Sequence, residues 1–125
     1  MTKKENILLN KNNAIEILNK KLLLNIKHSE LVFCNICSSK PEWWFHVSNK
    51  KFNSNLHLLL NNYKKRILYH FFIKSGSIKN PYVLFYQDSG KNDESNMHIP
   101  VGDEYFTDRK EKYQFIKYLN MEIKY

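Results

Sequence analysis

The chain has 125 residues, of which 42% are hydrophobic and 14% aromatic, and it carries a formal net charge of +8. Length and aromatic content exclude a disordered chain and predict one globular domain, 1–125, with residues 1–10 loosely ordered. Only three glycines are present, which excludes glycine-rich nucleotide-binding loops, and no apolar run reaches the roughly 20 residues of a membrane span.

The first half of the chain predicts one helix followed by a β-hairpin. A cap at Asn12 or Asn13 precedes apolar side chains at helical spacing, namely Ile15, Leu18, Leu22 and Ile26. Residues 30–37 are β-favouring and mostly apolar, and a second β-favouring run, 43–48, follows the turn at residues 38–41. We therefore expect an antiparallel hairpin over residues 31–48.

The second half predicts a helix, two or three strands and a final helix. Residues 54–63 place most of their leucines on one side of a helix, and residues 66–73 form an apolar central strand. Residues 82–87 predict another strand, residues 88–96 a solvated loop, and residues 97–99 an edge strand. Asp108 and Glu111 form a capping box for the last helix. The fold class is α+β, a mainly antiparallel sheet of four to five strands with two to three packing helices.

Side-chain alternation in the strand over residues 43–48 separates its two tryptophans. Trp43, Phe45 and Val47 point toward the core, and Trp44 lies on the opposite face. The alternation leaves open whether Trp44 is covered by a helix or exposed to a partner. Further aromatic residues predicted for the core are Phe71, Phe72 and Phe85.

The positive charge is concentrated in the first two thirds of the chain. Residues 1–87 carry 14 Lys/Arg against 4 Asp/Glu, whereas residues 88–125 carry 6 against 8. Such a basic surface fits a polyanion, and an exposed Trp44 would stack on unpaired bases. Only two basic residues are arginines, which argues against strong sequence specificity. The predicted nucleic-acid-binding residues are Lys50, Lys51, Lys64, Lys65, Arg66, Lys74 and Trp44.

Cys34 and Cys37 have the spacing of a zinc or redox pair, and His28 or His46 are the nearest candidate ligands. In a strand, however, residues three apart point to opposite faces, so buried structural cysteines are the preferred interpretation. We therefore predict no metal and no cofactor, and keep these four residues as weak metal candidates. His46 and His70 lie on two predicted strands. The two histidine side chains would pair across the sheet if these strands are neighbours.

No catalytic residue is predicted, and a metal-dependent nuclease or a fragment of a restriction-type enzyme remains a third alternative. Such an enzyme needs two or three carboxylates that converge on a metal ion. The carboxylates that would have to converge are Asp88, Asp93 and Asp103. Their sequence context matches solvated loops better than a nuclease motif.

The first hypothesis for function is a non-enzymatic module that contacts nucleic acid through a lysine-rich face without strong sequence specificity. The second is a small protein-interaction factor of a phage or mobile element, such as an inhibitor or accessory subunit. Two cysteines and the lack of a secretion signal predict a cytoplasmic location. The oligomeric state, and the choice between DNA and RNA, stay open.

Overall fold

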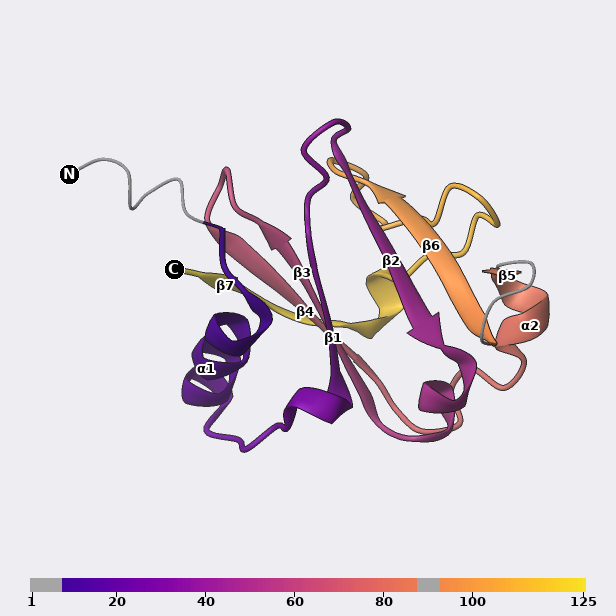
Figure 1. The fold of residues 1–125 in the computed structure, drawn as a ribbon, viewed down its shortest axis with the longest axis horizontal. Helices are drawn as coiled ribbons and strands as arrows, with labels where there is room; N and C mark the ends of the chain where they lie inside the picture. Colours follow the sequence, from indigo (N-terminus) through magenta and orange to yellow (C-terminus); the bar gives the residue numbers. More distant parts are fainter. Residues whose placement is uncertain (1–7, 88–92) are drawn as a thin grey trace.

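Two β-sheets packed face to face, with one long helix against the outside of the larger sheet, make up the fold (Figure 1). The structure is a computed structural model that describes residues 8–87 and 93–125. Its strands are β1 (Leu31–Asn35), β2 (Glu42–Ser48), β3 (Leu56–Asn62), β4 (Ile67–Ile73), β5 (Tyr86–Gln87), β6 (Glu94–Pro100) and β7 (Leu119–Lys124). Its helices are α1 (Lys11–Leu22), α2 (Pro81–Leu84) and 3₁₀ turns at His28–Glu30, Asn49–Asn53 and Ile116–Tyr118. The α+β prediction is confirmed.

The larger sheet, sheet A, has the strand order β1-β3-β4-β7. The β1–β3 pair is parallel, and the other pairs in sheet A are antiparallel. The smaller sheet, sheet B, has the order β2-β6-β5 and is antiparallel throughout. The expected four-stranded sheet is therefore present, but a second sheet accompanies it.

The main core lies between the two sheets. Leu58 and Phe71 from sheet A meet Trp43, Phe45 and other inward residues of sheet B, and all of them are buried. Trp43 is 2% exposed, and its indole nitrogen donates a hydrogen bond to the backbone oxygen of Asn61 across the gap between the sheets, at 3.1 Å. The predicted inward face of the strand over residues 43–48 is confirmed.

Helix α1 covers the other face of sheet A. Asn10 caps it by accepting a hydrogen bond from the Asn13 backbone, so the helix begins earlier than predicted. Ala14 and Leu18 pack with Leu59, Leu68 and other buried residues into a second core. Sheet A is thus covered on both faces, which explains why β3 and β4 are apolar on both sides.

The predicted hairpin over residues 31–48 is wrong. β1 joins sheet A beside β3, while β2 belongs to sheet B. Residues 36–41 between them are long enough for the chain to cross from one sheet to the other. The Cys37 amide donates to the Glu42 carbonyl at 2.9 Å and closes this crossing.

The helix predicted for residues 54–63 is a strand, β3. The run has leucines at consecutive positions, and a short apolar run does not distinguish a buried strand from a buried helix. Here the neighbouring strands β1 and β4 decide the outcome, because they pair with β3 along its length. The strand predicted for residues 66–73 is confirmed as β4.

The final helix predicted after Asp108 is also wrong. Asp108 does accept the Glu111 amide, at 3.1 Å, as a cap would. Lys112 then takes a left-handed backbone conformation, φ 64°, which ends the turn. The chain continues irregularly to Phe115 and forms the strand β7.

Several smaller predictions also change. Residues 82–87 divide into the short helix α2 and the two-residue strand β5. The expected edge strand at residues 97–99 is part of β6, the central strand of sheet B. Phe72, expected in the core, is 36% exposed on the α1 side of sheet A. Residues 94–96, predicted in a solvated loop, belong to β6, and Ser95 is fully buried; residues 88–92 of that loop and residues 1–7 of the loose start lie outside the described residues. No helix among the residues described could cross a membrane.

The substitution Leu58→Ala tests the strand assignment of β3. Leu58 is 1% exposed and faces sheet B, so we expect a loss of about 2–5 kcal/mol in the free energy of unfolding. In a helix with Leu56, Leu59 and Leu60 inward, Leu58 would be near the surface. A loss well under 1 kcal/mol in urea unfolding would therefore contradict the two-sided burial of β3.

Candidate functional site

The solvent-facing side of sheet B carries a group of aromatic and charged side chains. Strand alternation puts Trp44 and His46 of β2 on this side, across from His98 and Asn96 of β6. Tyr86 of β5 pairs with Asn96 and continues the row. We call this side the outer face, and its residues are Glu42, Trp44, His46, Tyr86, Asn96, His98, Arg109 and Lys110.

Trp44 is half exposed and rigidly placed. Its indole nitrogen donates to Asn96 Oδ1 at 2.7 Å, and its ring stacks on His98 with centroids 4.9 Å apart and planes 23° apart. Half of the side chain, 50%, remains accessible to solvent. An exposed aromatic ring with a fixed orientation is suited to stack on a planar ligand, because little rotational freedom is lost on binding.

A chain of charge-assisted hydrogen bonds lies beside Trp44. His98 Nδ1 donates to Glu42 Oε2 at 3.1 Å, and Arg109 Nε donates to Glu42 Oε1 at 3.0 Å. Burial alone would raise the pKa of Glu42, but the hydrogen bonds from His98 and Arg109 hold that pKa below its usual value. Glu42 therefore stays ionised and fixes both partners in place.

The irregular segment that supplies Arg109 is tied to β6 by a buried aspartate. Asp108 is fully buried and accepts the His98 amide at 2.9 Å, and the Arg109 amide donates to the His98 carbonyl at 2.8 Å. The next residue, Lys110, places its ammonium 4.4 Å from the centre of the Tyr86 ring. Two cations thus border the aromatic surface of the outer face.

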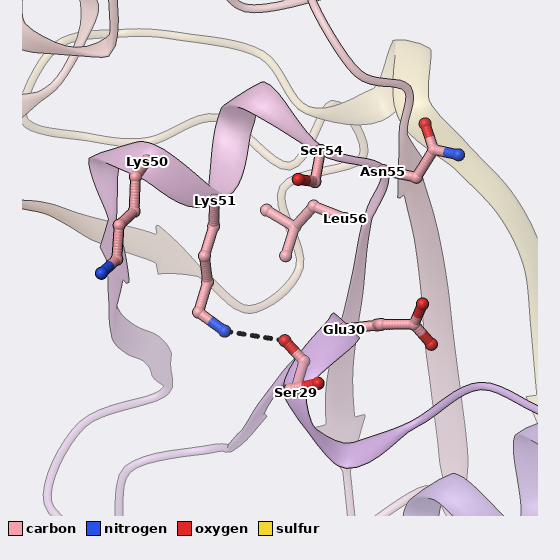
Figure 2. A pocket seen from close by; sticks show the side chains of 7 residues that line it. All are labelled: Ser29, Glu30, Lys50, Lys51, Ser54, Asn55 and Leu56. Carbon is pink, nitrogen blue, oxygen red and sulfur yellow. Dashed lines mark hydrogen bonds between the residues drawn. The ribbon is translucent and has the colours of Figure 1, made fainter.

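A polar cleft of ≈ 520 Å³ lies between the 3₁₀ turn Asn49–Asn53 and the starts of β1 and β3 (Figure 2). Lys51 reaches across it and donates to the Ser29 carbonyl at 2.9 Å, while Lys50 is exposed and extends away from Leu56. Glu30 is the acidic residue of the lining. Lys11 lies near Lys51. Burial and, as the smaller effect, the charge of Lys51 lower the pKa of Lys11.

The predicted lysines do not lie together. Lys50, Lys51 and Lys74 lie near the end of sheet A where Leu56 pairs with Ile73, whereas the Lys64–Arg66 turn follows the other end of β3. A seven-residue strand separates these ends by about 20 Å.

The surroundings of the Lys64–Arg66 turn are not purely basic. Lys65 borders a hollow that also includes Asp103, Glu104 and Glu122. Arg66 Nε donates to the Tyr125 carbonyl at 2.9 Å, and its guanidinium lies over the Tyr125 ring. The structure therefore offers two separate basic regions instead of one continuous face.

The contacts of the four weak metal candidates do not indicate a metal site. Cys34 Sγ donates to the Trp44 carbonyl at 3.3 Å, and burial raises the pKa of its thiol to about 12, which disfavours the thiolate that binds metal. Cys37 follows the end of β1, His28 begins a 3₁₀ turn, and His46 lies 4.0 Å from Glu94. Within residues 8–87 and 93–125, no three His, Cys, Asp or Glu side chains are grouped for a metal ion.

A histidine pair under α1 was missed by the sequence analysis. His70 does not pair with His46, which is in the other sheet, but with His57: Nε2 of His70 and Nδ1 of His57 are 2.9 Å apart. Asn120 Nδ2 lies 3.1 Å from His70 Nδ1 and donates to it, so His70 Nε2 carries the proton donated to His57. The alternation of β3 and β4 could have indicated this pair, had β3 been recognised as a strand.

Comparisons with known proteins found no match to this chain. No family model matches the sequence, and no curated protein or solved structure is significantly similar to it. Function must therefore be inferred from the geometry of the chain itself.

The histidine pair predicts how stability depends on pH. Burial, and then the neighbouring His57, lower the pKa of His70 from 6.5 to about 4. The unfolded chain therefore binds a proton first as the pH falls, and stability should decrease from pH 6.5 down to about pH 4, by up to about 3 kcal/mol. In urea unfolding at several pH values, His70→Gln should flatten this decrease, and His28→Gln, at an exposed site, should leave it unchanged. Equal slopes for all three proteins would contradict the assignment.

Proposed function

We propose that the protein is a non-enzymatic module that binds single-stranded nucleic acid on the outer face of sheet B. The observation that carries the proposal is the half-exposed Trp44 ring, fixed by Asn96 and His98. Stacking of a base on such a ring contributes about 1–3 kcal/mol and tolerates any base. Tyr86, 41% exposed on the same face, offers a second ring.

Cations around these rings support phosphate binding. Arg109 and Lys110 lie at the border of the outer face, and Lys50 lies two residues after the end of β2, the strand that carries Trp44. Lysine and arginine neutralise backbone phosphates without regard to sequence. The net charge of +8 adds long-range attraction for a polyanion.

Single strands fit this face better than a duplex. A sheet face stacks on bases only when they are unpaired, since base pairing hides the flat surfaces inside the helix. Duplex grooves are entered by a protruding helix or ribbon. The long helix α1 is packed along sheet A with Ala14 and Leu18 fully buried.

The second candidate, a protein-interaction factor of a phage or mobile element, is favoured by a different surface. Leu23 is 88% exposed at the end of α1, and Leu24 and Phe72 line an apolar hollow of ≈ 200 Å³ beside the histidine pair. Exposed apolar groups of this kind are typical of protein contacts. Such binding would depend only weakly on salt.

The nuclease alternative receives no support from the carboxylates that the structure describes. Asp93 precedes β6 and Asp103 follows it, so a whole strand separates them. Asp93 accepts a hydrogen bond from Asn49, and Asp103 accepts the Tyr105 and Thr107 amides. Asp88 lies outside the described residues. We therefore do not propose a metal-dependent reaction.

Fluorescence anisotropy with labelled 12-nucleotide single strands tests the proposal. If three phosphates are neutralised, affinity should fall roughly 20-fold between 50 and 200 mM salt. Trp44→Ala should weaken binding by about 5-fold or more, because a stacked base is lost. Leu23→Ala, an exposed apolar site on the α1 side, is the matched control and should bind as the unsubstituted protein does.

Charge-reversal variants show which basic region contributes to nucleic-acid binding. Lys110→Glu, beside Tyr86 on the outer face, should weaken binding more than Lys64→Glu in the turn after β3. The reverse order would move the site to the Lys64–Arg66 turn. No binding at 50 mM salt would remove the nucleic-acid proposal and leave the protein-interaction candidate.

A further inference from the structure

Arg109 differs from the other basic residues of the outer face in how firmly it is held. Its Nε donates to the buried carboxylate of Glu42 at 3.0 Å, and its backbone amide donates to the His98 carbonyl at 2.8 Å. Its side chain nevertheless remains 47% exposed. The guanidinium is therefore fixed at one edge and accessible at another.

The hydrogen-bonding capacity of this guanidinium exceeds what Glu42 uses. An arginine side chain has five N–H donors in one plane, and Glu42 takes the one on Nε. The terminal nitrogens carry the other four in a rigid fork. A fork of this kind forms two parallel hydrogen bonds to a ligand with two neighbouring acceptors, which a lysine ammonium does not do.

The same carboxylate links Arg109 to the stacking ring. Glu42 binds Arg109 through Oε1 and His98 through Oε2, and Trp44 stacks on His98. Glu42 and Trp44 are also two residues apart on β2, so their side chains are neighbours on the outer face. The fork and the ring are thus linked through Glu42 and His98 before any ligand binds.

Guanine is the base that matches both groups. Its flat surface stacks on an aromatic ring, and its O6 and N7 are adjacent acceptors for a bidentate arginine. On their accessible edges adenine and thymine place donors next to acceptors; cytosine has an acceptor pair, O2 and N3, but its single ring covers less of an indole than the two rings of guanine. We propose that Arg109 recognises guanine when that base stacks on Trp44. This inference rests on the proposed function and adds one base-specific contact to a face that otherwise recognises no sequence.

The test compares single bases within an otherwise uniform strand. The probes are labelled dT12 and three variants in which one central thymine is replaced by guanine, adenine or 7-deazaguanine. The guanine strand should bind roughly 10-fold more tightly than the adenine strand, within the range of a bidentate arginine–guanine contact. The 7-deazaguanine strand, which stacks but lacks the N7 acceptor, should lose most of this preference.

Variants of the two arginines provide the matched comparison. Arg109→Lys keeps the charge beside Glu42 but lacks the fork, so it should bind the guanine strand and the adenine strand with equal affinity. Arg66→Lys, at the Tyr125 contact, should change neither affinity. A thermal unfolding curve checks that each variant is folded, and the 7-deazaguanine strand tests the inference on the unsubstituted protein alone.

The outcomes separate this inference from the proposed function. Equal affinity for the guanine and adenine strands, or a guanine preference that survives in Arg109→Lys, would overturn guanine recognition while leaving single-strand binding intact. An equal loss for all four strands in Arg109→Lys would show a phosphate contact and also overturn it. Failure of every strand to bind would refute both.

Discussion

The buried carboxylate of Glu42 is the constraint on which the outer face depends. A charge with 6% exposure is tolerated only when it is paired and hydrogen-bonded, and Glu42 has two such partners, His98 and Arg109. These bonds join β2, β6 and the irregular segment after Gly102. Removing the carboxylate would leave the His98 and Arg109 donors without this partner and release the Arg109 side chain from its place on the face. One side chain therefore orders both the local fold and the candidate site.

The two tryptophans of β2 lie on opposite faces of sheet B, Trp43 in the core and Trp44 on the candidate binding surface. Trp43 is buried between the sheets and donates to the Asn61 carbonyl, so it connects sheet B to sheet A. Trp44, one position further, is turned to solvent and fixed by Asn96. Strand alternation alone produces this division. A binding surface supported by a packed sheet needs little reorganisation when a ligand arrives.

Local patterns predicted part of this molecule, and long-range contacts determined the rest. Alternation was sufficient for β2 and for the inward direction of Trp43, and the continuous apolar run over residues 66–73 was sufficient for β4. The local pattern failed for β3, because its consecutive leucines are compatible with a helix or with a strand buried on both faces. Only the pairing with β1 and β4 distinguishes the two. The site was harder, since Glu42 lies 56 positions from His98 and 67 from Arg109. No local pattern joins residues so far apart, and Arg109 lies on a segment for which a helix was predicted.

The most direct test of binding on the outer face uses the two indole N–H signals in a proton–nitrogen NMR spectrum. One signal belongs to Trp44 and the other to buried Trp43, which serves as an internal control; single substitutions to Phe assign them. During titration with dT12, the Trp44 signal should shift in proportion to the bound fraction, and the Trp43 signal should stay in place. Saturating dT12 that leaves the Trp44 signal unmoved while shifting amides of the Lys64–Arg66 turn would contradict the account.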